Sequence, residues 1–282
     1  MEQIAEVKIA QLLGEASQYY AERAPSVDAL EEFNKRLEHA RSVVWDRGSK
    51  VNGEEKKLPK VFIGLPYLHG VQLETAKGLL ADFSADRVVP DFHDFSSSLL
   101  AHGFNHLWST CLNKGLYDYF FLCHADIGFR TSNFLDPLIE EMERGGWDVL
   151  HVPQPIKDDR GLTSTAIGNA KDRWAWRRRI TMTELDRLPD TFGLAEVLEV
   201  MKLHALPLNP VFLPNTAVML VKWADWCWKF PGFNIEDRIE IRNEGGKSVA
   251  VANVVPEDWA FGWWCAQQGL KVGGCKRVKC DH

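Results

Sequence analysis

The stretch FFLCHADIGF, residues 120–129, places an apolar run directly before a histidine, an alanine and an aspartate. An apolar run of this length is typical of a strand that is buried on both faces of a sheet. Side chains two residues apart in a strand point to the same side, so His124 and Asp126 are predicted to face one ligand. Gly128 has no side chain and leaves room for that ligand. The stretch therefore predicts a buried strand with a polar site at its carboxyl end.

Strand-like and helix-like segments alternate around this stretch. The other predicted strands are KVFIGLP (60–66), RVVPDF (87–92) and WDVLHVPQ (147–154), and the predicted helices are QLETAKGLLADF (72–83), SSSLLAHGFNHLWSTCLNKG (96–115) and NFLDPLIEEMERGG (133–146). This alternation predicts an α/β fold with a parallel sheet that helices cover on both faces. Ligands of such sheets bind outside the carboxyl ends of the strands, which is where His124 and Asp126 lie.

The N-terminal part of the chain has a different pattern. Apolar residues at helical spacing in residues 3–22, and a second helix capped by Ser26, predict a helical hairpin over residues 1–50. A polar segment rich in helix breakers then leads into the α/β domain, predicted for residues 59–282. We expect the hairpin either to pack on the sheet or to mediate a homodimer.

Composition limits the class of protein. The 282 residues are 45% hydrophobic and carry a formal net charge of −6, which suits one large core and gives no general attraction for nucleic acid or anionic membranes. The apolar runs are too short for a membrane span. The six cysteines contain no CxxC pair, which predicts free thiols and a reducing, cytoplasmic location. The terminal group Cys275, Cys280 and His282 is compatible with a zinc site, although a strand with buried thiols explains it more simply.

Two segments in the second half carry further candidate chemistry. PEDWAFGWW (256–264) places Glu257 and Asp258 in the first turn of a helix, where acids also complement the helix dipole, and Trp259 follows them. KDRWAWRRRI (171–180) interleaves arginines with tryptophans, a composition that suits nucleic acid or a phosphorylated ligand, although a solvated basic segment explains it more simply. The preceding RGLTSTAIG (160–168) is predicted to be a mobile loop.

Taken in order, these features resemble the GT-A glycosyltransferase superfamily. The resemblance covers about residues 60–282 and rests on a strand ending in LPY, a helix bearing an asparagine, a strand ending in HAD and the later PEDW helix. The family marker is an Asp-x-Asp motif, and here His124 occupies the first aspartate position. The resemblance implies a GT-A fold, with a Rossmann-like, mixed but mainly parallel sheet flanked by helices. It also implies transfer of a sugar from a nucleoside-diphosphate sugar, with a UDP-sugar favoured.

The resemblance also assigns residues to a donor site. It implies that Mn²⁺ or Mg²⁺ bridges the diphosphate of the sugar nucleotide, with the ligands His124, Asp126 and His282. Such an ion would neutralise charge that develops on the leaving diphosphate. Residues implied to contact the nucleotide are Pro66, Tyr67, Asp91, Asp94, Asn105 and Asp126.

On the acceptor side, the resemblance implies that Asp258 is the general base and that Glu257 orients it, which weakly favours an inverting reaction and leaves retention open. The acceptor is predicted to be a glycan or small-molecule hydroxyl, or a hydroxymethylated pyrimidine in DNA. Candidate acceptor residues are Trp259, Arg177, Arg178, Trp176 and Asn215.

Two other interpretations remain open. A nucleotidyltransferase has a related sheet, but such enzymes usually carry a glycine-rich basic loop after the first strand, and LPYLHG (65–70) lacks one. A non-catalytic sugar- or DNA-binding module, with a degenerate site or the terminal zinc, would also fit the missing first aspartate.

Overall fold

The computed structural model describes residues 49–51, 54–56, 58–68, 70–82, 88–202 and 209–281. The predicted N-terminal hairpin (1–50) therefore lies almost entirely outside the described residues, and His282 does as well. The first described strands, β1 (Ser49–Val51) and β2 (Glu54–Lys56), pair antiparallel within the segment that the sequence identifies as a linker.

A seven-stranded sheet of order β10–β15–β7–β12–β5–β3–β4 forms the centre of the described chain. Its strands are β3 (Lys60–Tyr67), β4 (Val89–Ser96), β5 (Tyr119–Cys123), β7 (Val149–His151), β10 (Thr191–Phe192), β12 (Val218–Lys222) and β15 (Val272–Cys275). β3 pairs in parallel with β4 and β5, and β7 pairs in parallel with β15. β12 runs antiparallel between β5 and β7, and β10 is antiparallel at one edge. The predicted mixed, mainly parallel sheet is confirmed.

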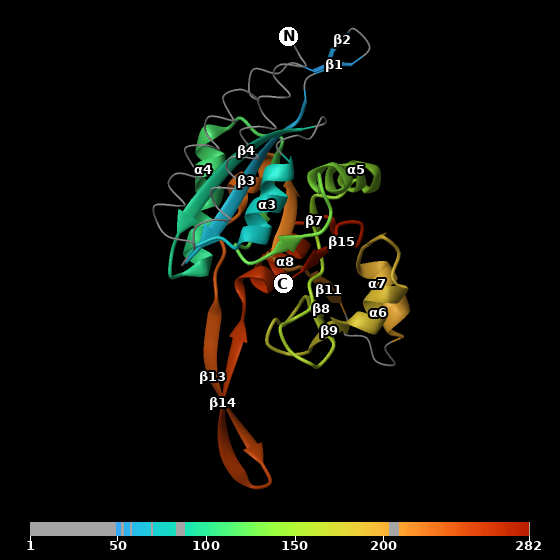
Figure 1. Ribbon diagram of the computed structural model, residues 1–282. Coiled ribbons are helices and arrows are strands. Elements are labelled where there is room, and N and C mark those ends of the chain that lie inside the picture. Colours follow the sequence, from blue (N-terminus) through green and yellow to red (C-terminus); the bar gives the residue numbers. More distant parts are fainter. Residues whose placement is uncertain are drawn as a thin grey trace.

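Helices cover both faces of this sheet (Figure 1). They are α3 (Leu73–Asp82), α4 (Leu100–Lys114), α5 (Leu135–Gly145) and α8 (Glu257–Gln267). Because strand side chains alternate, Ile63 and Phe121 join one core cluster with α3 and α5, while Phe62 and Phe120 join a second cluster with α4 and α8. The near-continuous apolar strands of the sequence are thus explained by burial on both faces.

A second, three-stranded antiparallel sheet lies beside the first and has the order β11–β8–β9. It consists of β8 (Leu162–Asn169), β9 (Arg177–Thr181) and β11 (Pro210–Leu213), and the helices α6 (Met182–Arg187) and α7 (Leu194–Met201) pack against it. The sequence predicted a mobile loop over 160–168, and that prediction is wrong. Thr163, Ala166 and Ile167 are buried in β8. The adjacent side chains of Ala166 and Ile167 belong to two different core clusters.

A long two-stranded ribbon projects away from these layers (Figure 1). It is formed by β13 (Glu236–Glu244) and β14 (Lys247–Val255), joined through Gly245 and Gly246, which both have positive φ. Two such residues form the tight turn that suits the twist of an antiparallel hairpin. The sequence analysis does not predict this ribbon, in which Ile239 is 75% exposed and alternates with charged residues.

The C-terminal residues return to the main sheet region. After β15, the short strand β16 (Cys280–Asp281) pairs antiparallel with β6 (Gly128–Phe129), which directly follows the HAD stretch. A 3₁₀ helix, η1 (Asp225–Lys229), completes the described elements. All six cysteines are free, and Cys275 belongs to the core. No helix in the described ranges combines the length and apolar character needed to span a bilayer.

Candidate functional site

The carboxyl ends of β3, β4 and β5 lie side by side, and the HAD stretch occupies the end of β5. The strand ends at Cys123, and residues 124–127 form a turn in which the amide of Ile127 points to the carbonyl of His124 at 3.4 Å. The alternation expected of a strand therefore does not extend to His124 and Asp126. Instead, the backbone N–H of His124 donates to the carbonyl of Ala217, and its Nε2 lies 3.4 Å from Thr216 Oγ1.

Asp126 contacts a cation supplied by the chain itself. Lys157 Nζ lies 2.7 Å from Asp126 Oδ2, and the two side chains are 55% and 35% exposed, so this ion pair is accessible to ligands. In the β16–β6 pairing, Asp281 lies opposite Gly128, which brings the end of the described chain alongside the turn. The described residues contain no group of three or more His, Cys, Asp and Glu side chains able to hold a metal. In that part of the chain, His124 and Asp126 are the predicted ligands.

Of the residues predicted to contact the nucleotide, Tyr67 and Asp94 lie at the carboxyl ends of β3 and β4. Their side chains are hydrogen bonded across the β3–β4 pair, and burial, with the nearby Asp94 carboxylate, raises the pKa of Tyr67 to about 12. Pro66 is buried and packs against Gly103 of α4. A β-carbon added at Gly103 would lie only 3.3 Å from the Cβ of Pro66. Tyr67 and Asp94 are therefore better placed for a nucleotide than Pro66.

Asp91 and Asn105 have structural surroundings instead. Asp91 is 1% exposed, accepts a hydrogen bond from the Tyr117 hydroxyl and pairs with His93 at 3.2 Å. Asn105 Nδ2 donates to the carbonyl of Phe233, and its Oδ1 accepts from the Phe233 N–H. These surroundings favour structural roles for both residues, because the Asp91 carboxylate is buried and the Asn105 side chain holds the backbone of Phe233.

The first turn of α8 holds the predicted acidic pair. Glu257 is 8% exposed, and burial raises its pKa. Asp258 Oδ1 accepts a hydrogen bond from the backbone N–H of Trp259 at 2.7 Å. Burial, and then the neighbouring Glu257 carboxylate, raise the pKa of Asp258 to about 8, while Arg179 acts in the opposite direction. A carboxylate with a pKa close to neutrality is suited to proton transfer, so Asp258 has the properties expected of a general base.

Trp259 lies against two arginines of β9. The guanidinium carbons of Arg177 and Arg179 are 5.4 and 4.7 Å from the centre of its ring, which is cation–π distance. Arg177 Nη1 donates to the carbonyl of Val254, and Arg179 Nη1 donates to the carbonyls of Thr163 and Ser164. The sequence analysis did not select Arg179 as a site residue, although its spacing of two from Arg177 in a strand predicts a shared side.

The remaining predicted acceptor residues point elsewhere. Arg178, between these arginines on β9, pairs with Glu184 of α6 at 2.6 Å, and Trp176 packs against the cluster beneath α6 and α7. Asn215 is 2% exposed; its Nδ2 donates to the carbonyl of Val152 and its Oδ1 accepts from the N–H of Ala217. These contacts favour structural roles for Trp176, Arg178 and Asn215. Asn215 shapes the segment that contacts His124.

One turn connects the HAD stretch with the arginines. The N–H of Ile156 donates to the carbonyl of Leu162, closing a turn that begins with Lys157, the partner of Asp126. The same turn carries Asp158 and Arg160, which pair with each other at 2.6 Å. Asp158 raises the pKa of Arg179, and Arg160 lowers it. The two halves of the candidate site therefore flank a single short turn.

A pocket of about 420 Å³ lies at the opposite, amino-terminal edge of the sheet, lined by Leu58, Pro59, Tyr117, Asp118, Tyr119, Glu143, Lys222 and Trp223. Its polar groups already have partners: Tyr119 donates to Glu143, Lys222 pairs with Glu143, and Asp118 accepts from the N–H of Lys60. The chemistry of the carboxyl edge, rather than this pocket, defines the candidate site.

Comparisons with known proteins do not place the chain in a family. No protein-family model and no curated protein matches it. Among solved structures it is similar to A197 from STIV, with a TM-score of 0.44 and 11% sequence identity over 78% of this chain and 84% of that one. A similarity at this level assigns neither a family nor an activity.

Proposed function

We propose that the protein is a metal-dependent glycosyltransferase of the GT-A type, which moves a sugar from a nucleoside-diphosphate sugar, with UDP-sugars as the first donors to test. The acceptor is a hydroxyl of a glycan or small molecule, or of a hydroxymethylated pyrimidine in DNA. The observation that carries the proposal is the turn holding His124 and Asp126 at the carboxyl ends of β3, β4 and β5, alongside β16. In such α/β sheets, this edge is where ligands bind.

The residues at this edge fit a divalent cation. An imidazole and a carboxylate suit Mn²⁺, and cations in phosphate-binding sites commonly take only one or two carboxylates, with substrate phosphates and water completing the shell. His124 and Asp126 would hold the ion, and His282 is the proposed third ligand. When bound, the ion would stabilise negative charge on the leaving diphosphate. Lys157 Nζ pairs with the Asp126 carboxylate at 2.7 Å, so a bound ion would have to share or replace this contact.

The other residues have distinct roles in the proposal. Tyr67 and Asp94, joined at the ends of β3 and β4, form the surface on which the nucleoside would lie. Asp258 would take the proton from the acceptor hydroxyl, an inverting reaction, and Glu257 beside it raises its proton affinity. Trp259 and Arg177 border Asp258 on the acceptor side.

Donor binding tests the proposal directly. The unfolding temperature would be measured with UDP, UDP-sugars and other nucleotides, each with Mn²⁺, Mg²⁺ or EDTA. A ligand at 100 times its Kd stabilises the folded state by about 2.7 kcal/mol, so a Mn²⁺-dependent increase with one donor is expected.

The variants His124→Ala and Asp126→Ala should remove this increase. Matched controls are His102→Ala and Asp186→Ala, which change the same residue types at exposed positions of α4 and α6 and should retain it. Metal-dependent donor binding that is unchanged in His124→Ala and Asp126→Ala would contradict the proposal. Pyrophosphate release from a nucleoside triphosphate would instead identify a nucleotidyltransferase.

A further inference from the structure

The cluster of Arg177, Arg179 and Trp259, here the arginine–tryptophan cluster, has an imbalance of charge. Both arginines are partly buried, yet among the described residues no carboxylate lies within ion-pair distance of either guanidinium. Arg178, between them on β9, has such a partner in Glu184. Withdrawing a charge from water without a counter-ion is unfavourable, so the cluster favours an external anion.

Further positive charge surrounds the cluster. Burial, and then the nearby Arg238, lower the pKa of Arg177. Burial also lowers the pKa of Arg179, with Arg160 contributing, although Asp258 and Asp158 oppose this effect. Arg238 itself lies over the ring of Trp174 at 4.3 Å. Arg238 and Arg160 are paired with Glu240 and Asp158, so Arg177 and Arg179 are the guanidinium groups left without a carboxylate partner at this surface, within the described residues.

Several N–H donors of Arg177 and Arg179 have no acceptor among the described residues. Arg177 and Arg179 are two residues apart on β9, so their side chains leave the strand on the same side. Arg177 donates one hydrogen bond from Nη1 to a backbone carbonyl, and Arg179 donates two from Nη1. No described residue accepts a hydrogen bond from the Nε or Nη2 of either side chain. The Nε–Nη2 edge of a guanidinium is a planar pair of donors that matches two oxygens of a phosphate. The carbonyl bonds and the Trp259 ring hold these edges in place.

We propose that the arginine–tryptophan cluster binds a phosphate ester group of the acceptor, held by Arg177 and Arg179. That the bound phosphate belongs to the acceptor rests on the proposed function, because Asp258, the proposed base, directly precedes Trp259. The binding of the phosphate itself does not depend on it. The phosphate can come from the backbone of a nucleic acid or from a phosphorylated sugar, and the experiment separates the two.

The experiment measures binding of two probes to the full chain. They are a fluorescently labelled single-stranded oligodeoxynucleotide and glucose 6-phosphate, with glucose as the uncharged reference. The double variant Arg177→Gln/Arg179→Gln should bind the recognised probe at least about tenfold more weakly, because charge-assisted hydrogen bonds are lost. For the oligonucleotide, the association constant should depend less on salt: the negative slope of its logarithm against log salt concentration should become shallower by about 1 to 2. Binding of the oligonucleotide alone identifies a nucleic acid acceptor, and binding of glucose 6-phosphate alone a small one.

Two further variants control for charge and folding. Arg177→Lys/Arg179→Lys keeps the charges but loses the paired donors, so an intermediate affinity is expected. Arg187→Gln removes an exposed arginine of α6 that has no ion pair among the described residues, and it should bind as the wild type does. The proposal is overturned if the wild type binds neither phosphorylated probe, or if the glutamine variant binds the recognised probe within twofold of the wild type.

Binding of UDP with Mn²⁺, measured on the same samples, separates this proposal from the proposed function. The glutamine variant should retain it, since the donor edge is unchanged. A wild type that binds a phosphorylated probe but no sugar nucleotide would leave the phosphate site standing and remove the glycosyltransferase. A wild type that binds Mn²⁺–UDP but neither phosphorylated probe would remove the phosphate site alone.

Discussion

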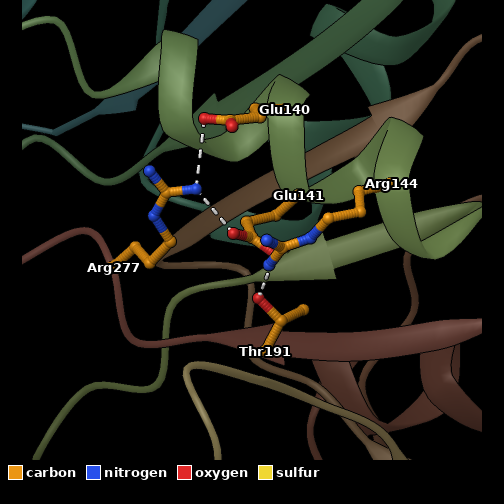
Figure 2. Close-up of polar contacts among 5 residues, drawn as sticks. All are labelled: Glu140, Glu141, Arg144, Thr191 and Arg277. Carbon is orange, nitrogen blue, oxygen red and sulfur yellow. Dashed lines mark hydrogen bonds and ion pairs between the residues drawn. The ribbon is translucent and has the colours of Figure 1, made fainter.

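Glu141 in α5 and Asp258 in α8 are both acidic side chains close to arginine, yet their surroundings act on them in opposite directions. Figure 2 shows Glu141 among its partners: Thr191 Oγ1 and Arg277 Nη1 each donate at 2.6 Å, and Arg144 donates as well. Burial raises the pKa of Glu141, but these hydrogen bonds outweigh that effect and hold the pKa below its usual range. The Glu141 carboxylate thereby links α5 to Thr191 of β10 and to Arg277 in the segment after β15.

Asp258 has much less compensation. Among the described residues, no basic group lies within ion-pair distance of its carboxylate, and the adjacent Glu257 carries like charge. Its pKa of about 8 therefore reflects incomplete pairing rather than burial alone, since Glu141 is also buried. Contact with an arginine therefore does not identify a functional site by itself. A carboxylate with hydrogen bonds from several donors stabilises the fold. A buried carboxylate with few such donors has a raised pKa and can exchange a proton near neutral pH.

The largest expected effect concerns activity. If Asp258 is the general base, Asp258→Asn should lower kcat about 10²- to 10⁴-fold, because an amide cannot accept the proton. Turnover would be measured with the donor and acceptor identified by binding. The matched variant Glu141→Gln should change kcat little in the folded fraction. Equal losses in both variants would remove the functional distinction between the two acids.

The next effect concerns stability. Glu141→Gln should reduce the free energy of unfolding by about 1–3 kcal/mol, because donors arranged around a buried charge lose their acceptor. Glu140→Gln is the matched control, since the neighbouring Glu140 is 48% exposed and shares only Arg277 (Figure 2). Its loss should stay below about 1 kcal/mol in urea denaturation. Similar losses for the two variants would show that the Glu141 cluster is no stronger than a surface ion pair.

The pH dependence of stability should differ in sign between the two acids. The raised pKa of Asp258 means that the folded state holds a proton which the unfolded state releases above about pH 4, so this residue lowers stability as the pH rises towards 8. Asp258→Asn should therefore raise the unfolding temperature, and more at pH 8 than at pH 5.

Glu141 provides the opposite trend in the same measurement. Its pKa is lowered, so its stabilisation is present above its unfolded pKa of about 4.3 and is lost as the pH falls through the folded pKa. The destabilisation by Glu141→Gln should thus shrink towards acid. Parallel pH profiles for the two variants would contradict the contrast.

The smallest effect tests the partial compensation of Asp258. Arg179 lowers the pKa of Asp258, so Arg179→Gln should raise that pKa by about one pH unit or less. Carboxyl carbon chemical shifts, followed by NMR during a pH titration of the ligand-free protein, measure it without any substrate. Arg177→Gln is the control, because Arg177 is not among the groups that shift Asp258. An unchanged or lowered pKa in Arg179→Gln would show that the two side chains are not coupled.

The strand–helix alternation from residue 60 onward could be read from the sequence, and so could the turn of acids at the start of α8. Apolar spacing depends on neighbours in the chain, and Gly115 ends α4 with φ 60° as its position predicts. The β8–β9 pair could not be predicted in this way, because its strands contain no long apolar run and β8 also pairs with β11, about 45 residues further along the chain. The β13–β14 ribbon does have local signals, namely the alternation in EDRIEIRNE and the Gly245–Gly246 turn, and the sequence analysis did not use them.

Local sequence patterns predict the class of fold, the burial of the central strands on both faces and the polar residues where β3, β4 and β5 end, because periodicity and strand ends are local properties. Which of those polar residues are taken up by internal contacts depends on the tertiary structure. Asp91 became buried beneath Tyr117, Asn105 clamped the backbone of Phe233, and Arg179 came to lie beside Trp259. Burial, charge pairing and pKa depend on contacts between distant segments, and no local pattern specifies these contacts.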